Sequence, residues 1–149
     1  MKTAIVYVST HHGNTKKLVD AIAGENDVTL IDAVKQKSED LSDYDCIGFA
    51  SGIAYGKFYP QMLAFMEANL PQGKKVFFLF TYGAARTGYT KAAADIAKER
   101  ACSILGEYGC QGFDTYGPLK LVGGIAKGHP TEEEIDGARK FFKGLQEKA

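Results

Sequence analysis

The feature that most constrains the fold of this chain is the alternation of short apolar runs with segments of helical periodicity. Five short runs have the character of strands, and they cover residues 4–8, 28–31, 46–50, 75–80 and 109–115. The run 46–50 is continuously apolar, as expected of a strand buried on both faces, 75–80 is the strongest, and 109–115 is weaker. Neighbouring parallel strands need crossover connections, which helices supply. The pattern therefore predicts an α/β domain: a three-layer, doubly wound, five-stranded parallel sheet with helices on both faces.

The helical segments are marked by apolar residues three or four positions apart. These residues are Leu18, Ala21 and Ile22; Leu63, Met66 and Leu70; Ala92, Ile96, Ala97, Ile104 and Leu105; and Ile135, Ala138, Phe142 and Leu145. Pro60 suits the first turn of the second segment, and residues 131–134 have the pattern of a capping box before the last. The polar stretch 35–45 has room for only a short helix.

The loop after the first apolar run carries the donors that a phosphate group needs. Hydroxyl groups at Ser9, Thr10 and Thr15 and the amide of Asn14 can donate hydrogen bonds, while Gly13 permits a positive φ and close backbone approach. A helix that begins at Asn14 or Thr15 directs unsatisfied N–H groups and its positive dipole end to the same point. The alternative is an ordinary helix cap after a strand-to-helix turn.

Two further loops follow strand-like runs and combine glycines with aromatic residues. They cover residues 51–60 and 81–89, and neither has the composition of solvated filler. Each loop alone is a weak signal, because a tyrosine in a loop is as often a packing residue as a ligand contact.

Composition limits the class of protein. A chain of 149 residues with 45% hydrophobic content suits one domain over residues 1–149. Its three cysteines lack a C-x-x-C spacing, which argues against a disulfide framework or a zinc site. The 18 basic and 18 acidic residues give a net charge of zero, so nucleic-acid binding is not expected. With no signal-peptide pattern and no membrane-spanning apolar run, we expect no membrane insertion and a cytoplasmic location.

The loop Ser9-Thr10-His11-His12-Gly13-Asn14-Thr15 resembles the (S/T)-x-T-G-(N/T)-T phosphate loop of flavodoxins, which bind the 5′-phosphate of FMN. His12 stands where the family usually has threonine. Residues 45–51, 81–83 and 127–134 also look like a short-chain flavodoxin, so the resemblance covers essentially the whole chain. It implies the strand order 2-1-3-4-5, which brings the carboxyl ends of strands one, three and four around one crevice.

The resemblance implies FMN as the cofactor and no catalytic residue. No metal site is expected, because the adjacent His11 and His12 have no carboxylate or cysteine near them in the loop to complete a ligand set. Residues that match the phosphate loop are Ser9, Thr10, His11, Gly13, Asn14 and Thr15. Those that would hold the ring and the ribityl chain are Ser51, Gly52, Ile53, Tyr55, Gly56, Thr81, Tyr82, Gly83 and Tyr89. Tyr55 and Tyr89 are the candidates for stacking on the flavin, and Tyr82 is a substitute for either.

The implied function is electron transfer between redox proteins, a reductase and an electron acceptor, by weak and transient docking of a monomer. Flavodoxins are usually strongly acidic, whereas this chain is neutral and carries Lys57 and Arg86 in its second and third loops. The identity of its partners is therefore open, because redox proteins dock through complementary charge.

Other proteins of similar architecture fit less well. Residues 51–58 resemble the same loop of menaquinone-dependent protoporphyrinogen oxidases, so a small FMN-dependent oxidoreductase is the alternative, although the chain lacks their long extra loop. A response-regulator receiver needs paired acids where this chain has Ser9 and Thr10, and a low-molecular-weight phosphatase needs Cys-x₅-Arg in the first loop. A flavodoxin-like interaction module without FMN remains a further possibility.

Overall fold

The computed structural model describes residues 1–10, 13–113 and 126–148. The elements in chain order are β1 (Thr3–Val8), α1 (Asn14–Ala23), β2 (Val28–Asp32), β3 (Cys46–Ala54), β4 (Lys57–Phe58), α2 (Pro60–Asn69), β5 (Lys75–Tyr82), α3 (Lys91–Glu99), β6 (Ser103–Gln111) and α4 (Glu132–Lys148). Five strands pair in parallel in the order β2-β1-β3-β5-β6. This is the predicted order 2-1-3-4-5, and the two-residue β4 adds an antiparallel pairing with the end of β3.

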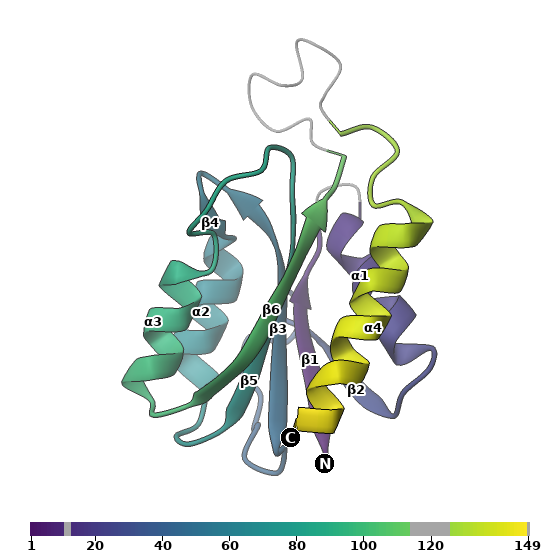
Figure 1. Ribbon diagram of the computed structural model, residues 1–149. Helices are drawn as coiled ribbons and strands as arrows, with labels where there is room; N and C mark the ends of the chain where they lie inside the picture. The colour runs from purple at the N-terminus through teal and green to yellow at the C-terminus, as the bar shows by residue number, and fades with distance from the viewer. Residues whose placement is uncertain (11–12, 114–125, 149) are drawn as a thin grey trace.

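Helices cover both faces of the sheet (Figure 1), with α1 and α4 on one face and α2 and α3 on the other. Each face has its own core. Along β1, Ala4, Val6 and Val8 face the core under α2 and α3, whereas Ile5 faces the core under α1 and α4. Because both faces of an interior strand are buried, its sequence is a continuous apolar run rather than an alternating one.

Phenylalanines on β5 pack beside glycines on the strands that flank it. Gly48 is the register partner of Phe77, and Gly109 is the partner of Phe80. A Cβ atom on Gly48 would lie 2.3 Å from Cζ of Phe77, and one on Gly109 would lie 2.2 Å from Cε2 of Phe80. The two aromatic rings therefore occupy space that only a glycine neighbour leaves open.

The boundary between the third helix and the last strand differs from the prediction. Helix α3 ends at Glu99 and β6 begins at Ser103, so Ile104 and Leu105 lie on the strand and not on a helix. Ile104 packs against the core under α2 and α3 and Leu105 against the opposite core, as alternate residues of a strand do. The predicted strand over 109–115 was thus placed too late, and its residues 114 and 115 lie outside the described residues.

Helix α3 ends without the glycine that usually marks such a stop. Ala101 has a φ of 53°, its N–H donates to the carbonyl of Lys98, and the N–H of Cys102 donates to the carbonyl of Ala97. These bonds form a Schellman motif, in which the left-handed residue is normally glycine. An alanine at this position gives no sequence signal for the helix end.

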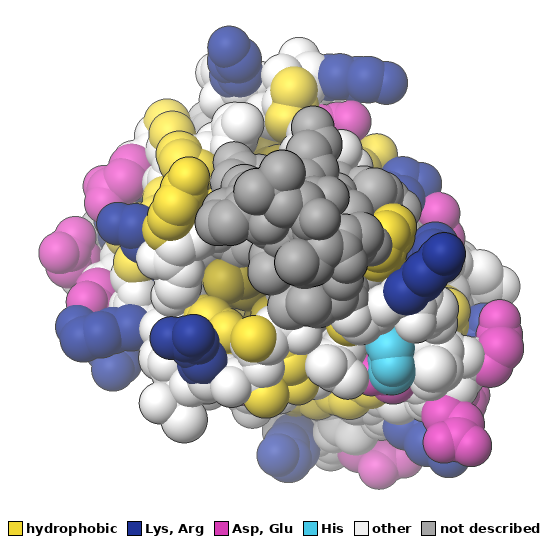
Figure 2. All heavy atoms as spheres, turned by 90° about the horizontal axis from the view of Figure 1, so that it is seen from above, with side chains coloured by type: hydrophobic (Ala, Val, Ile, Leu, Met, Phe, Trp, Pro, Cys, Tyr) yellow, Lys and Arg dark blue, Asp and Glu magenta, His cyan; other side chains and the backbone are white. Residues whose placement is uncertain are grey.

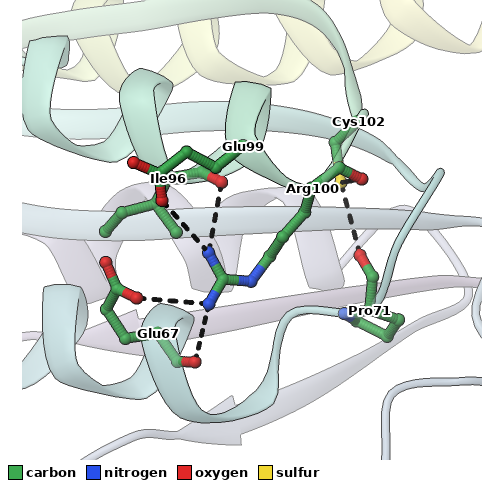
Figure 3. Close-up of polar contacts among 6 residues, drawn as sticks. All are labelled: Glu67, Pro71, Ile96, Glu99, Arg100 and Cys102. Carbon is green, nitrogen blue, oxygen red and sulfur yellow. Dashed lines mark hydrogen bonds and ion pairs between the residues drawn. The ribbon is translucent and has the colours of Figure 1, made fainter.

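Arg100 fastens the ends of α2 and α3 together (Figure 3). Its Nη2 atom donates to the backbone carbonyl of Glu67 at 2.8 Å and to the carboxylate of Glu67 at 3.2 Å. Its Nη1 atom donates to the carbonyl of Ile96 at 3.3 Å, and Cys102 Sγ lies 3.4 Å from the carbonyl of Pro71. These contacts lie at the carboxyl ends of both helices, where a cation also interacts favourably with the helix dipole.

The polar stretch 35–45 forms turns and contains no helix. The side chain of Asn69, at the end of α2, donates to the carbonyl of Lys37 at 2.9 Å and accepts from the N–H of Glu39 at 3.1 Å. One amide thus holds this connection against α2. Between them lies a groove of about 540 Å³ lined mainly by alanines, Val34 and Phe65, away from the three loops considered below.

Candidate functional site

The three loops singled out from the sequence lie together at the carboxyl end of the sheet (Figure 1), the end that Figure 2 shows from above. A small hollow there is lined by residues of all three, among them Asn14, Gly52, Thr81 and Gly83. The convergence follows from the strand order, because the loops after β1, β3 and β5 leave neighbouring strands at the same edge.

The first loop leads into α1 without a capping side chain at the first position. Gly13 precedes the helix with a φ of 66°, and it has no side chain that could cap the helix. Ser9 takes over part of that role, since its Oγ accepts a hydrogen bond from the N–H of Lys16 at 3.0 Å. A hydroxyl that accepts in this way keeps its own hydrogen for another acceptor. Thr10 is exposed beside it, and His11 lies outside the described residues.

A buried pair of hydroxyl groups joins the first loop to the third. Oγ1 of Thr15 and Oγ1 of Thr81 lie 2.8 Å apart, and both side chains are buried. Either can be the donor, so one hydrogen of the pair is used and one remains available. Nothing in the sequence pairs these two residues, because they are 66 positions apart.

Asn14 connects the start of α1 to the segment after β6. Its Nδ2 atom donates to the carbonyl of Phe113 at 2.8 Å, whereas its buried Oδ1 atom accepts no hydrogen bond from any residue that the structure describes. Gly112 makes room for this side chain, since a Cβ there would lie 2.7 Å from Nδ2 of Asn14. The prediction treated Asn14 as a donor to phosphate. In the structure its Nδ2 atom donates to Phe113, and its Oδ1 atom meets no donor among the described residues.

The second loop is a tight β-hairpin. Ala54 pairs with Lys57 across a two-residue turn, in which Tyr55 has a φ of 53° and Gly56 a φ of 80°. Positive φ at both central residues is typical of a type I′ turn, which matches the twist of the flanking strands. Tyr55 is 88% exposed at the tip of this hairpin.

Residues before the hairpin are engaged within the protein. Ser51 is buried, and its Oγ donates to the carbonyl of Gly52 at 2.7 Å and accepts from the N–H of Tyr59 at 3.0 Å. A Cβ on Gly52 would lie 2.5 Å from the hydroxyl oxygen of Tyr59. The ring of Tyr59 therefore fills the space beside Gly52, and Ile53 continues the strand to its pairing with Phe58.

The third loop holds two stacked tyrosines. The rings of Tyr82 and Tyr89 lie 5.6 Å apart at an interplanar angle of 30°, and Tyr89 also meets the edge of Phe80. Tyr89 is only 7% exposed, and its hydroxyl donates to the carbonyl of Ala84. Tyr82 is half-buried. Tyr89 thus lies behind Tyr82, while Tyr55 stands at the surface of the neighbouring loop.

The sequence missed the contribution of the segment that follows β6. Gly112 and Phe113 line the hollow with Asn14, the N–H of Gly112 donates to the carbonyl of Tyr82 at 2.8 Å, and the side chain of Gln111 donates to the carbonyl of Gly83 at 3.3 Å. The available signal was the Gly-Phe pair after the last strand, which the late placement of that strand concealed.

The cysteines near the sheet have little nucleophilic character. Burial raises the pKa of Cys110 to about 12 and that of Cys46 to about 11, so both remain thiols near neutral pH. Among residues 1–10, 13–113 and 126–148, no group of three histidine, cysteine or acidic side chains is placed to hold a metal ion. In the same part of the chain, no helix is long and apolar enough to cross a membrane.

Comparisons with known proteins agree with this architecture. An uncharacterized protein of Methanocaldococcus jannaschii is 37% identical over 147 residues, which are 97% of this chain and 98% of that protein. A flavodoxin from the domain Archaea has a TM-score of 0.66 at 21% identity, covering 99% of this chain and 98% of its own. General stress protein 14 of Treponema denticola, solved in complex with FMN, has a TM-score of 0.68 at 15% identity, covering 98% and 100%.

The family itself is defined by sequence. Residues 5–105 match the family model described as a flavodoxin domain, a range that includes the phosphate-type loop and the second and third loops. The chain therefore belongs to the flavodoxin domain family.

Proposed function

We propose that this chain binds FMN at the carboxyl end of its sheet and carries electrons between redox proteins. The observation that carries the proposal is the convergence of hydroxyl donors on the amino-terminal end of α1, beside a glycine of positive φ. A helix start of this kind is a ready site for a phosphate group. The FMN in the structure of the Treponema denticola neighbour supports the choice of ligand.

The first loop suits a phosphate because its hydroxyls retain hydrogens to donate. Ser9 accepts from the N–H of Lys16, and its own hydrogen is left for the anion. Thr15 keeps its hydrogen when Thr81 is the donor within their pair. Gly13 lets the ligand approach the backbone, and we propose that Thr10 and His11 complete the loop around it.

Asn14 fits the polyhydroxyl chain that joins the phosphate of FMN to its ring. A buried acceptor without a donor is unfavourable by about 1–3 kcal/mol, and Oδ1 of Asn14 is such an atom in the structure. A ligand hydroxyl at this point supplies the missing donor. The hollow between Asn14, Thr81 and Gly83 is the place where the ribityl chain would pass.

The second and third loops are the proposed cover for the flavin ring. Tyr55 is exposed at the hairpin tip and Tyr82 is half-buried across from the first loop, while Tyr89 supports Tyr82 from behind. Gly56 offers a peptide group beside Tyr55. Bound FMN supplies redox chemistry in steps of one or two electrons, while these residues position the ring and limit its access to water.

We propose that the chain works as a cytoplasmic monomer that meets a reductase and an acceptor in turn. The test is the binding of FMN and of riboflavin to the wild-type chain and to the Thr15→Ala variant, by fluorescence quenching of each flavin. Loss of one hydrogen-bond donor to the phosphate should raise the dissociation constant for FMN about tenfold, equivalent to about 1.4 kcal/mol, and that for riboflavin much less. The Thr15→Ser variant keeps the hydroxyl and is the matched control.

If Thr15→Ala weakens the binding of FMN and of riboflavin equally, the first loop does not bind the phosphate group. Failure of the wild-type chain to bind FMN would overturn the proposal and favour a flavodoxin-like interaction module. Stepwise anaerobic reduction then separates the two remaining functions. Transfer of single electrons supports the carrier, and reduction in one two-electron step supports the small FMN-dependent oxidoreductase.

A further inference from the structure

The charged side chains of this neutral protein are unevenly distributed along its long axis. Three segments surround the carboxyl end of the sheet, residues 8–19, 51–66 and 81–94, and they contain no acidic residue. Their basic residues are Lys16, Lys17, Lys57, Arg86 and Lys91. Figure 2 shows this end of the molecule, with Lys and Arg side chains on several sides and the Asp and Glu side chains mainly toward the outline.

Some of these cations are neutralised and some are not. Lys16 pairs with Asp20 at 2.6 Å and Lys91 with Asp95 at 2.9 Å, both along their own helices. Lys57 and Arg86 are exposed, and neither forms an ion pair with any residue that the structure describes. They stand on the second and third loops, which are the proposed cover of the flavin ring.

The acidic run of the chain lies at the opposite end of the sheet. Residues 38–45 contain four acids and no base. Asp45 fixes this run near the starts of β1 and β5, because its carboxylate accepts from the backbone N–H of Lys2 and its carbonyl accepts from the backbone N–H of Lys75. Among the described residues, the acids at the carboxyl end are Asp32 and the three in the first turn of α4, Glu132, Glu133 and Glu134, of which Glu132 and Glu133 are exposed. Oδ1 of Asp32 accepts from the N–H of Val34, and Glu134 binds the N–H of Thr131 within its capping box.

Helix direction reinforces this separation. In a sheet of parallel strands the helices that follow each strand run back over it, so the amino-terminal ends of α1, α2 and α3 are at the same end as the three loops. Each amino terminus carries about half a positive charge. The described part of the cofactor end is therefore positive around the second and third loops, whereas the exposed Glu132 and Glu133 place negative charge at the start of α4.

We infer that the surface formed by the 54–58 hairpin and the exposed 84–88 loop docks an acidic redox protein that exchanges electrons with the bound flavin. This inference rests on the proposed function. At physiological ionic strength charges act over about 8 Å, so the local side chains and not the net charge select the partner. Redox complexes bury little surface and depend on such complementary charge.

Electrons balance in the exchange. Each encounter moves one electron from reduced flavin to the oxidised centre of an acidic one-electron protein, such as a haem or iron–sulfur protein. Two encounters return the flavin to its oxidised form, and its protons are released to water. Lys57 and Arg86 take part only by holding the partner, because neither side chain gains or loses an electron or a proton.

The experiment measures how fast the reduced, FMN-loaded protein reduces two oxidised probes in a stopped-flow instrument. Cytochrome b5 is an acidic haem protein and cytochrome c is a basic one. We expect the rate constant with cytochrome b5 to fall as sodium chloride is added and the one with cytochrome c to rise. Lys57→Glu and Arg86→Glu should each lower the rate constant for reduction of cytochrome b5 at low salt by at least about threefold.

Lys75→Glu is the matched control, because it makes the same change in net charge on an exposed side chain at the amino end of β5. An effect of net charge alone would slow all three variants equally and would refute the docking surface. The opposite salt dependence of the wild-type protein would also refute it. Bound flavin is measured in every variant first, and if the wild-type chain retains no FMN, the proposed function fails and the inference falls with it.

Discussion

The turn at the tip of the second loop stores backbone strain at a position proposed to touch the flavin. Tyr55 is a bulky residue with a φ of 53°, followed by Gly56 with a φ of 80°. A left-handed conformation is unfavourable by about 1–2 kcal/mol for most residues, whereas asparagine tolerates it and Asn-Gly is the preferred pair in this turn. Replacing Tyr55 by asparagine should therefore relax the hairpin.

Tyr55→Asn is expected to change stability and flavin binding in opposite directions. Because Tyr55 is 88% exposed, the substitution removes little buried area, and the free energy of unfolding of the FMN-free protein should rise by about 1 kcal/mol. This corresponds to a rise in melting temperature of about 2–4 °C. Loss of an aromatic contact of about 0.5–1.5 kcal/mol should raise the dissociation constant for FMN about two- to tenfold.

Ala101 provides the matched control, since it has the same φ of 53° at the end of α3. Ala101→Gly relieves the same conformation and should stabilise the protein by about 0.5–1 kcal/mol, after allowance for the greater freedom of glycine in the unfolded chain. Its affinity for FMN should equal that of the wild type. Urea unfolding and flavin fluorescence measure both quantities. A loss of stability in Tyr55→Asn would refute the strain, and an unchanged affinity would refute the flavin contact.

Three further predictions concern stability and reactivity. Burial is the largest single effect and raises the pKa of Glu134, but hydrogen bonds from Thr131 and His129, with the charge of His129, together lower it below its ordinary value of 4.5. The contribution of Glu134 to stability is complete above pH 4.5 and is lost as the pH falls through the folded pKa. Glu134→Gln should therefore make unfolding less dependent on pH in this range. Gly48→Ala should lower the free energy of unfolding, measured in urea, by about 1–3 kcal/mol, because the added Cβ meets the ring of Phe77. If the Gly48→Ala substitution costs as much stability in a Phe77→Leu background, contact with this ring is not the cause. At pH 8 a disulfide reagent should modify the half-buried Cys102 before the buried Cys110, whose pKa of about 12 keeps it protonated.

The alternation of apolar runs and helical segments was sufficient to predict the fold class, and the resemblance supplied the strand order. The capping box at the start of α4 was also correct: the N–H of Thr131 donates to Glu134 at 2.8 Å, and Thr131 Oγ1 accepts from the N–H of Glu134 at 3.2 Å. Features of this kind are local, because each is decided by residues within one turn of helix or one strand.

The parts that could not be predicted depend on long-range packing. Nothing near Ala101 announces the end of α3, and Gly106 and Gly109 weaken the pattern of β6 because they make room for rings that belong to α4 and β5. The bond from Asn14 to Phe113 joins residues 99 positions apart. Sequence could suggest which loops meet, but not which atom of Asn14 would remain available.

The hydroxyl pair between Thr15 and Thr81 has a further consequence, because a hydrogen bond between two hydroxyls can run in either direction. When Thr15 donates its hydroxyl hydrogen bond to an anion, Thr81 must be the donor within the pair. Thr81 can then only accept a hydrogen bond from the rest of the ligand. Without the anion the pair is free to reverse, and Thr81 can donate. Phosphate binding at the first loop thus changes whether Thr81 in the third loop donates or accepts, through rotation of two hydroxyl groups and with no movement of the backbone.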